Sequence, residues 1–138
     1  MKIVVGCVNS DEGEAALKWA VEQAAREACE IIVVHSVRGG GSPEGEQEHV
    51  LEYRPKLDEI EARLSAANIP HTVRRLVRGL SPAEDLIDVV KEYGADLIAI
   101  GIRRRSRTGK LLMGSNAQEI LLSADCPVMT VKADYLKS

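Results

Sequence analysis

The chain has little aromatic character, since aromatic side chains make up only 3% of its 138 residues and phenylalanine is absent. Proteins that hold single-stranded nucleic acid stack bases on aromatic side chains, so this composition argues against that function. It contains 18 basic and 21 acidic side chains, and the resulting net charge of −3 does not suit a protein that coats duplex DNA. We therefore expect no nucleic-acid partner and a core of aliphatic side chains.

Cysteine and long hydrophobic runs are also scarce. The three cysteines, Cys7, Cys29 and Cys126, are scattered and form no C-x-x-C motif, which disfavours both a disulfide framework and a zinc site. The first apolar run, from Ile3 to Val8, is too short for a signal peptide or a membrane span. These absences predict a protein of the reducing cytoplasm, without a membrane segment.

Alternating apolar runs and amphipathic segments predict the fold. Buried strands are expected at 3–8, 31–37 and 97–100, and two further strands at 71–77 and 127–131. Helices are expected at 12–28, at 46–67 with a kink or a true start at Pro55, from Ser81 to Gly94, and from a cap at Ser115 or Asn116. Uninterrupted apolar strands separated by helices indicate an α/β fold, an open five-stranded parallel sheet with helices on both faces. We expect a single domain, 1–138.

Ligands of such folds bind at the carboxyl edge of the sheet, where the strand order reverses. The loops that reach this edge begin at Val8, Ser36 and Gly101. The third loop is the most informative, because no acidic residue occurs from Leu97 to Gln118. Five cations fall within eight positions of it, namely Arg103, Arg104, Arg105, Arg107 and Lys110. Either these cations form solvated surface ion pairs, or the loop belongs to an anion site.

The end of this loop favours an anion site. Gly114 and Ser115 stand where the next helix begins, so free backbone N–H groups and a hydroxyl are expected to point the same way. A helix N-terminus with small residues and nearby cations binds phosphate readily. Gly101 would let the backbone come close to a ligand.

The sequence resembles the universal stress proteins over essentially its whole length. The resemblance is strongest in residues 10–20, 32–37 and 112–132, which end in a Gly-Ser helix start and a Cys-Pro-Val strand. It implies a Rossmann-like sheet with strand order 3-2-1-4-5 and a homodimer. Many members bind ATP through the pattern Gly-x2-Gly-x9-Gly-Ser/Thr.

This pattern maps onto Gly101 at its start and Gly114-Ser115 at its end, but Arg104 stands in place of the second glycine. In nucleotide-binding members an Asp at the end of the first strand commonly faces the ribose, and this chain has Val8 there. The family usually holds adenine by main-chain groups that map near Ser36. The predicted nucleotide-binding residues are Val8, Ser36, Gly101, Arg103, Arg104, Gly114, Ser115 and Asn116.

Three functions stay open at this point. The first is a cytoplasmic stress-response module that binds an adenine nucleotide, with ATP or AMP as the ligand and Mg²⁺ undecided. The second is a weak ATPase or phosphotransferase, and the third is an interaction protein whose nucleotide cleft is empty. We expect binding rather than catalysis. The apolar strand 127–131 predicts a homodimer built on a sheet edge, unless the tail 132–138 folds back to protect that edge.

Overall fold

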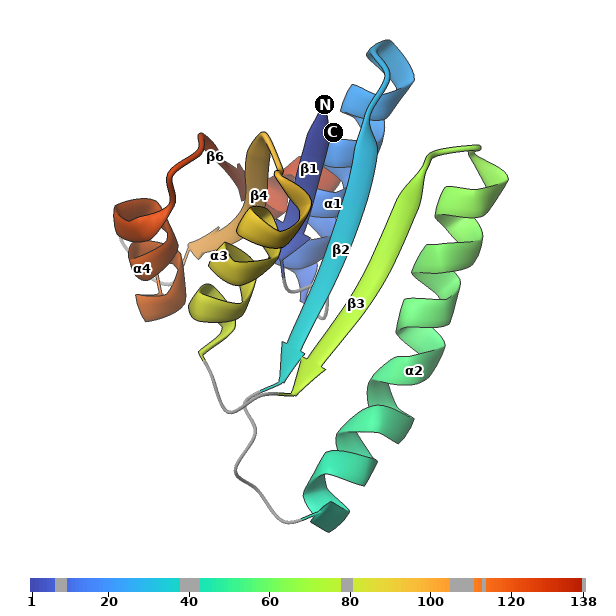
Figure 1. Ribbon diagram of the computed structural model, residues 1–138, viewed down its shortest axis with the longest axis vertical. Coiled ribbons are helices and arrows are strands. Elements are labelled where there is room, and N and C mark those ends of the chain that lie inside the picture. Colours follow the sequence, from blue (N-terminus) through green and yellow to red (C-terminus); the bar gives the residue numbers. More distant parts are fainter. Residues whose placement is uncertain (7–9, 38–42, 78–80, 105–110, 113, 138) are drawn as a thin grey trace.

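In the part of the chain that the structure describes, five parallel strands form the central sheet (Figure 1). The computed structural model describes residues 1–6, 10–37, 43–77, 81–104, 111–112 and 114–137. The parallel strands are β1 (Lys2–Gly6), β2 (Glu30–Val37), β3 (His71–Val77), β4 (Leu97–Arg104) and β6 (Val128–Lys132). They lie in the order β3-β2-β1-β4-β6. The predicted α/β fold and the strand order 3-2-1-4-5 are confirmed.

The strand β4 is longer than the sequence predicts. The apolar run predicts an end at Ile100, but the strand continues to Arg104. Residues 98–102 pair with β6, and residues 103–104 pair antiparallel with β5 (Leu111–Leu112). Backbone pairing depends on main-chain groups, so side-chain polarity underestimates the length of such a strand. Residues 105–110, which carry three of the five predicted cations, lie outside the described residues.

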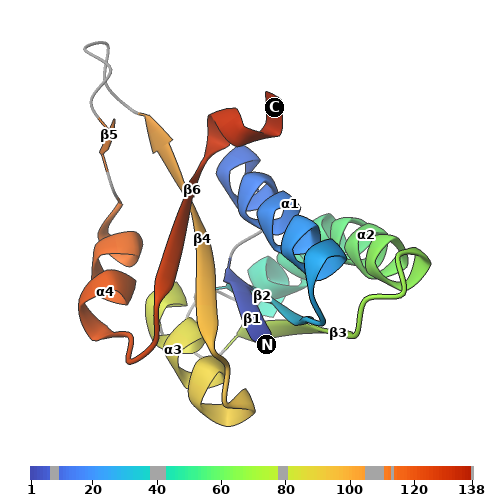
Figure 2. The ribbon, with the colours of Figure 1, turned by 90° about the horizontal axis from the view of Figure 1, so that it is seen from above.

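Helices cover both faces of the sheet, as Figures 1 and 2 show. The helices α1 (Asp11–Arg26) and α2 (Pro43–Ala66) pack on one face, and α3 (Pro82–Tyr93) and α4 (Ser115–Ser123) pack on the other. In β1, Ile3 and Val5 belong to the core under α1 and α2, while Val4 belongs to the core under α3 and α4. Successive strand residues point to opposite faces, so a strand buried on both sides requires a continuous apolar run.

The capping residues set the helix boundaries. Ser10 Oγ accepts a hydrogen bond from the Gly13 amide at 3.1 Å at the start of α1, and Ser81 Oγ accepts one from the Glu84 amide at 3.2 Å at the start of α3. Gly94 ends α3 with a left-handed φ of 63°, the conformation that glycine adopts most readily. The start and the stop of α3 are where the sequence predicts them, whereas α1 runs from Asp11 to Arg26 and not over the predicted 12–28.

The helix α2 differs more from its prediction. It starts at Pro43 rather than near residue 46, and it passes through Pro55. Pro55 therefore does not mark the beginning of the helix. Leu57, Ile60 and Leu64, which follow Pro55, are buried against the sheet and α1. The apolar stripe of this half thus holds the helix in place, even though a proline cannot donate a backbone hydrogen bond.

The last described segment, the 3₁₀ helix η1 (Ala133–Lys137), packs against α1 (Figure 2). The Tyr135 hydroxyl donates a hydrogen bond to the Glu22 carboxylate, and Lys18 Nζ donates one to the Tyr135 carbonyl oxygen at 3.0 Å. These contacts fix the tail on α1. Among the described strands, β6 pairs with β4 alone. None of the described helices combines the length and hydrophobicity that a membrane crossing needs.

Candidate functional site

A cleft opens at the carboxyl edge of the sheet, where β1 and β4 lie side by side. These two strands lead to helices on opposite faces, so the cleft lies at the point where the topology reverses. The base of the cleft comes from the ends of β1 and β4, and its walls come from the first turns of α1, α3 and α4. The described lining residues are Gly6, Ser10, Glu12, Gly13, Pro82, Leu86, Ile100, Gly101, Ile102, Gly114, Asn116, Ala117 and Ile120.

The three helices that reach the cleft begin differently. Serine side chains cap α1 and α3, as described above. The residue before α4 is Gly114, with φ −68° and ψ 164°, and no described side chain caps this helix. The sequence-based expectation of a cap at Ser115 or Asn116 is therefore wrong, because Ser115 is already the first helical residue and a cap must stand before it. Within the described residues, the first-turn N–H groups of α4 thus have no capping side chain and can donate to another acceptor.

The charges in the first turns sharpen this contrast. The first turn of α1 carries Asp11, Glu12 and Glu14, and that of α3 carries Glu84 and Asp85. The first turn of α4 carries no acidic residue. Carboxylates near a helix N-terminus compensate its positive end, so α4 presents the one uncompensated positive end among the three. An anion in the cleft is stabilised best at the start of α4.

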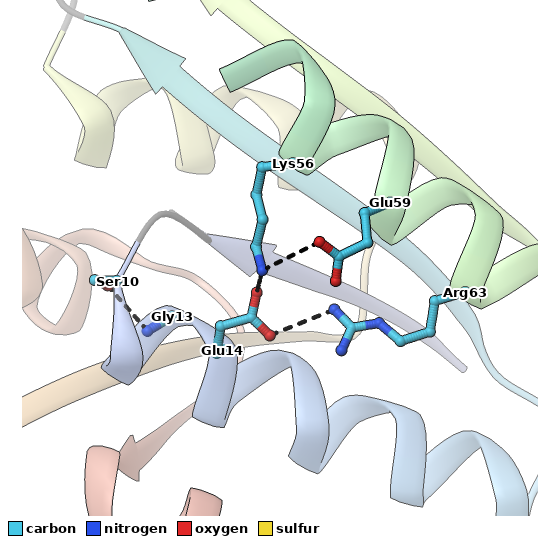
Figure 3. Close-up of polar contacts among 6 residues, drawn as sticks. All are labelled: Ser10, Gly13, Glu14, Lys56, Glu59 and Arg63. Atoms are coloured by element: carbon cyan, nitrogen blue, oxygen red, sulfur yellow. Dashed lines mark hydrogen bonds and ion pairs between the residues drawn. The ribbon is translucent and has the colours of Figure 1, made fainter. Parts of the chain in front are cut away.

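The three carboxylates of the first turn of α1 lie in different surroundings. Glu14 faces α2, where its carboxylate meets Lys56 Nζ at 2.6 Å and the Arg63 guanidinium at 3.4 Å (Figure 3). Glu12 lines the cleft, and Asp11 is exposed. The ion pairs of Glu14 are partly exposed, so each contributes on the order of 1 kcal/mol or less. Together they tie α2 to the turn of α1 that forms the cleft wall.

Gly101 brings β4 directly against α1. A Cβ atom built on Gly101 would lie 1.9 Å from the Glu12 carbonyl oxygen and 2.6 Å from Glu12 Cβ. The sequence predicts that this glycine admits a ligand, but the close approach seen here is that of the first turn of α1. Gly114 is different, because a Cβ built on it meets nothing within 4 Å. Of the two glycines predicted to belong to the site, Gly114 is therefore the one whose Cβ position is open.

Ser36 lies near the carboxyl end of β2. This strand is one position further from the point between β1 and β4 where the topology reverses. Its hydroxyl donates a hydrogen bond to the Asp85 carboxylate in α3, and Asp85 is fully buried. Ser36 is not among the described residues that line the cleft. Its side chain therefore fixes the end of β2 to α3, and the expectation that main-chain groups near it hold adenine stays a prediction.

The structure brings part of the predicted site together. The predicted residues found at the cleft are Gly101, Gly114 and Asn116. Ser115 begins α4, and Arg103 and Arg104 lie in the part of β4 that pairs with β5. Val8 lies outside the described residues. The structure thus places three of the eight predicted residues at the cleft, and a nucleotide-binding role for all eight stays a prediction.

Sequence reasoning missed two walls of the cleft. One comes from α1 through Ser10, Glu12 and Gly13, and the other comes from α3 through Pro82 and Leu86. A signal for them existed. Each of these helices follows a parallel strand, so its first turn must lie at the carboxyl edge, where ligands bind.

The described cysteines lie away from the cleft. Cys29 and Cys126 precede β2 and β6, which places them toward the amino edge of the sheet. Burial raises the pKa of both thiols, so neither is a reactive thiolate at neutral pH. Over the described ranges, no three His, Cys, Asp or Glu side chains come together as they would around a metal ion.

The sheet order and the cleft define a Rossmann-like α/β fold, and comparison with known proteins agrees. The sequence matches the model of the universal stress protein family over residues 1–132. A universal stress protein from Mycolicibacterium smegmatis is 33% identical over 130 residues, which cover 94% of this chain and 96% of that relative. This chain belongs to the universal stress protein family.

Solved structures show the same likeness. A universal stress protein from Archaeoglobus fulgidus superposes with a TM-score of 0.79 at 35% identity, covering 95% of this chain and 97% of that one. A universal stress protein structure from the same organism, in complex with dAMP, has a TM-score of 0.73 at 30% identity, covering 95% and 96%. The likeness thus extends over nearly the whole of each chain.

Proposed function

We propose that this chain binds an adenine nucleotide, ATP, ADP or AMP, in the cleft between β1 and β4, and acts as a stress-response binding module. The observation that carries the proposal is the start of α4, which has neither a capping side chain nor a first-turn carboxylate among the described residues. A Cβ atom built on Gly114, the residue before this helix, meets nothing within 4 Å among the described residues. A phosphate group fits this end of the cleft in charge and in hydrogen bonding.

Two further observations support a nucleotide as the ligand. The relative from A. fulgidus at 30% identity was solved in complex with dAMP. The segment 103–110, which follows the pairing of β4 with β6, brings five cations within eight positions. Guanidinium groups bind phosphate bidentately, so this composition suits a ligand that carries phosphate.

The charges of the cleft favour binding over turnover. Hydrolysis of a nucleotide needs carboxylates that hold a metal ion and a group that orients the attacking water. Glu12 is the one ionisable side chain among the described lining residues. We therefore place weak ATP hydrolysis second. A role for Mg²⁺ is tested by repeating the binding measurement with EDTA.

We also propose a cytoplasmic homodimer in which two copies meet along β6. Met129 on this strand is 37% exposed, and no described strand pairs with the outer edge of β6. Since η1 packs on α1, the described tail does not form a strand along that edge. An apolar edge strand with unpaired backbone groups is readily covered by a symmetric copy of itself. The cytoplasmic location rests on the scarcity of cysteine and on the family resemblance.

The nucleotide proposal is tested by the ligands that the protein carries. Purified protein is denatured, and the released small molecules are identified by mass spectrometry. We expect AMP, ADP or ATP at a substantial fraction of the protein concentration, or binding of added AMP by calorimetry that weakens as salt rises. No adenine nucleotide in the released fraction, together with no binding at millimolar AMP or ATP with or without magnesium, would contradict the proposal. It would favour an interaction protein with an empty cleft.

A further inference from the structure

We propose that Glu12 recognises the sugar of the bound nucleotide by accepting hydrogen bonds from its ribose hydroxyls. This inference rests on the proposed function, because it concerns the same cleft. It assigns a specificity-determining role to a residue that the sequence analysis did not select.

The position of Glu12 is fixed by its backbone. Gly101 lacks a Cβ, and this lets the Glu12 carbonyl group and Cβ pack directly on β4. The turn is held a second time by the hydrogen bond from the Gly13 amide to Ser10 Oγ (Figure 3). On its outer side, Glu14 is paired with cations of α2. These three contacts hold the backbone of the first turn of α1, so the Glu12 side chain starts from a fixed position. A side chain in a fixed position discriminates well between ligands.

The two ends of the cleft have opposite electrostatic character. The start of α4 is positive and has no first-turn carboxylate, whereas the wall formed by α1 includes the acidic residue Glu12. A phosphate at the α4 end is stabilised there and would be repelled by Glu12. The part of the ligand that faces Glu12 must therefore donate hydrogen bonds without carrying negative charge. In a nucleotide, the ribose is attached directly to the phosphate, and its hydroxyls are such donors.

The carboxylate of Glu12 has the capacity for this role. Its Oε2 atom is buried while the residue as a whole is half-buried, so water competes only in part for its hydrogen bonds. A carboxylate offers about four acceptor positions, so contacts within the protein leave it able to accept from a sugar. Asp11 is the natural comparison, because it carries the same charge on the same turn but is exposed and does not line the cleft.

The test compares AMP with 2′,3′-dideoxyadenosine 5′-monophosphate, which lacks both ribose hydroxyls. For the unmodified protein, calorimetry should show AMP binding about tenfold or more tightly, as expected for hydrogen bonds to a charged acceptor. Glu12→Ala should bring the ratio of the two dissociation constants close to one. Asp11→Ala should leave the ratio as it is in the unmodified protein. Circular dichroism verifies that both variants are folded.

The outcomes separate this inference from the proposed function. If AMP binds but the unmodified protein does not distinguish the two nucleotides, Glu12 does not recognise the sugar and the nucleotide site still stands. This result needs no variant and so does not depend on the folding of one. The same conclusion follows if Glu12→Ala keeps the full ratio, or if Asp11→Ala abolishes it equally. If neither nucleotide binds, the proposed function and this inference both fail.

Discussion

Replacing Gly101 with alanine should destabilise the protein in the absence of any ligand. The new Cβ would lie 1.9 Å from the Glu12 carbonyl oxygen. Unstrained contacts between carbon atoms lie at about 3.5–4.0 Å, so β4 and α1 must separate by roughly 1.5 Å. The opposing atom belongs to the backbone, and no rotation of a side chain relieves the overlap.

The magnitude follows from the packing that this separation disturbs. Ala15, Ala16 and Leu17 of α1 are buried in the core under this helix. Forcing extra volume into such a core costs about 1–3 kcal/mol, and a backbone clash belongs at the upper end. For a domain of this size, about 3 kcal/mol lowers the melting temperature by roughly 10 °C.

Gly114→Ala is the matched control. A Cβ at this position meets nothing within 4 Å, and the φ of −68° suits alanine. We expect it to change stability by less than about 1 kcal/mol, the cost of a poorer residue before the helix. Thermal unfolding of nucleotide-free protein, followed by circular dichroism, measures both variants. A Gly101→Ala variant that melts within about 2 °C of the unmodified protein would refute the packing role of this glycine.

Further changes test other parts of the account. Arg104→Gly should tighten AMP binding in calorimetry if the side chain fills ligand space, whereas a loss of roughly 1.5–3 kcal/mol would mean that its guanidinium grips phosphate. Met129→Lys should give a monomer in light scattering with native circular dichroism, and an unmodified protein of 15.0 kDa in solution at micromolar concentration would contradict the dimer. Glu14→Gln should cost about 1 kcal/mol or less, with a loss that shrinks at high salt. The hydrogen bond to Glu22 raises the pKa of Tyr135 above its usual value of about 10, so the stability difference between the unmodified protein and Tyr135→Phe should be constant below about pH 10 and disappear above it. A difference that grows with rising pH would contradict that bond.

Much of the fold can be predicted from the sequence, because the central strands have a continuous apolar pattern. Runs such as Ile3–Val5 are apolar at every position, and a strand buried on both faces needs that pattern. Local capping chemistry also predicts the start of α3 correctly at Ser81. Where the length of a strand depends on the strand that it pairs with, the local sequence pattern does not predict it. The extension of β4 to Arg104 depends on β5 and β6, which come later in the chain.

The candidate site shows the same division. The Gly-Ser start of α4 can be recognised in the sequence, because small residues at the start of a helix are a local signal for an anion site. The role of Gly101 is not visible, since it depends on a contact with Glu12, about ninety positions earlier in the chain. Glu12 itself looks like an ordinary first-turn carboxylate until the topology places it in the cleft wall.

A titration of ¹⁵N-labelled protein with AMP tests the central claim most directly, because backbone amide signals report where the ligand lies. We predict that the largest shifts fall on the first turn of α4, at residues 115–117, where the N–H groups have no described capping partner. Smaller shifts should occur at Gly101 and Glu12, which line the same cleft. Unmoved α4 amides at millimolar AMP, or largest shifts along β6, would contradict a phosphate site at the start of α4.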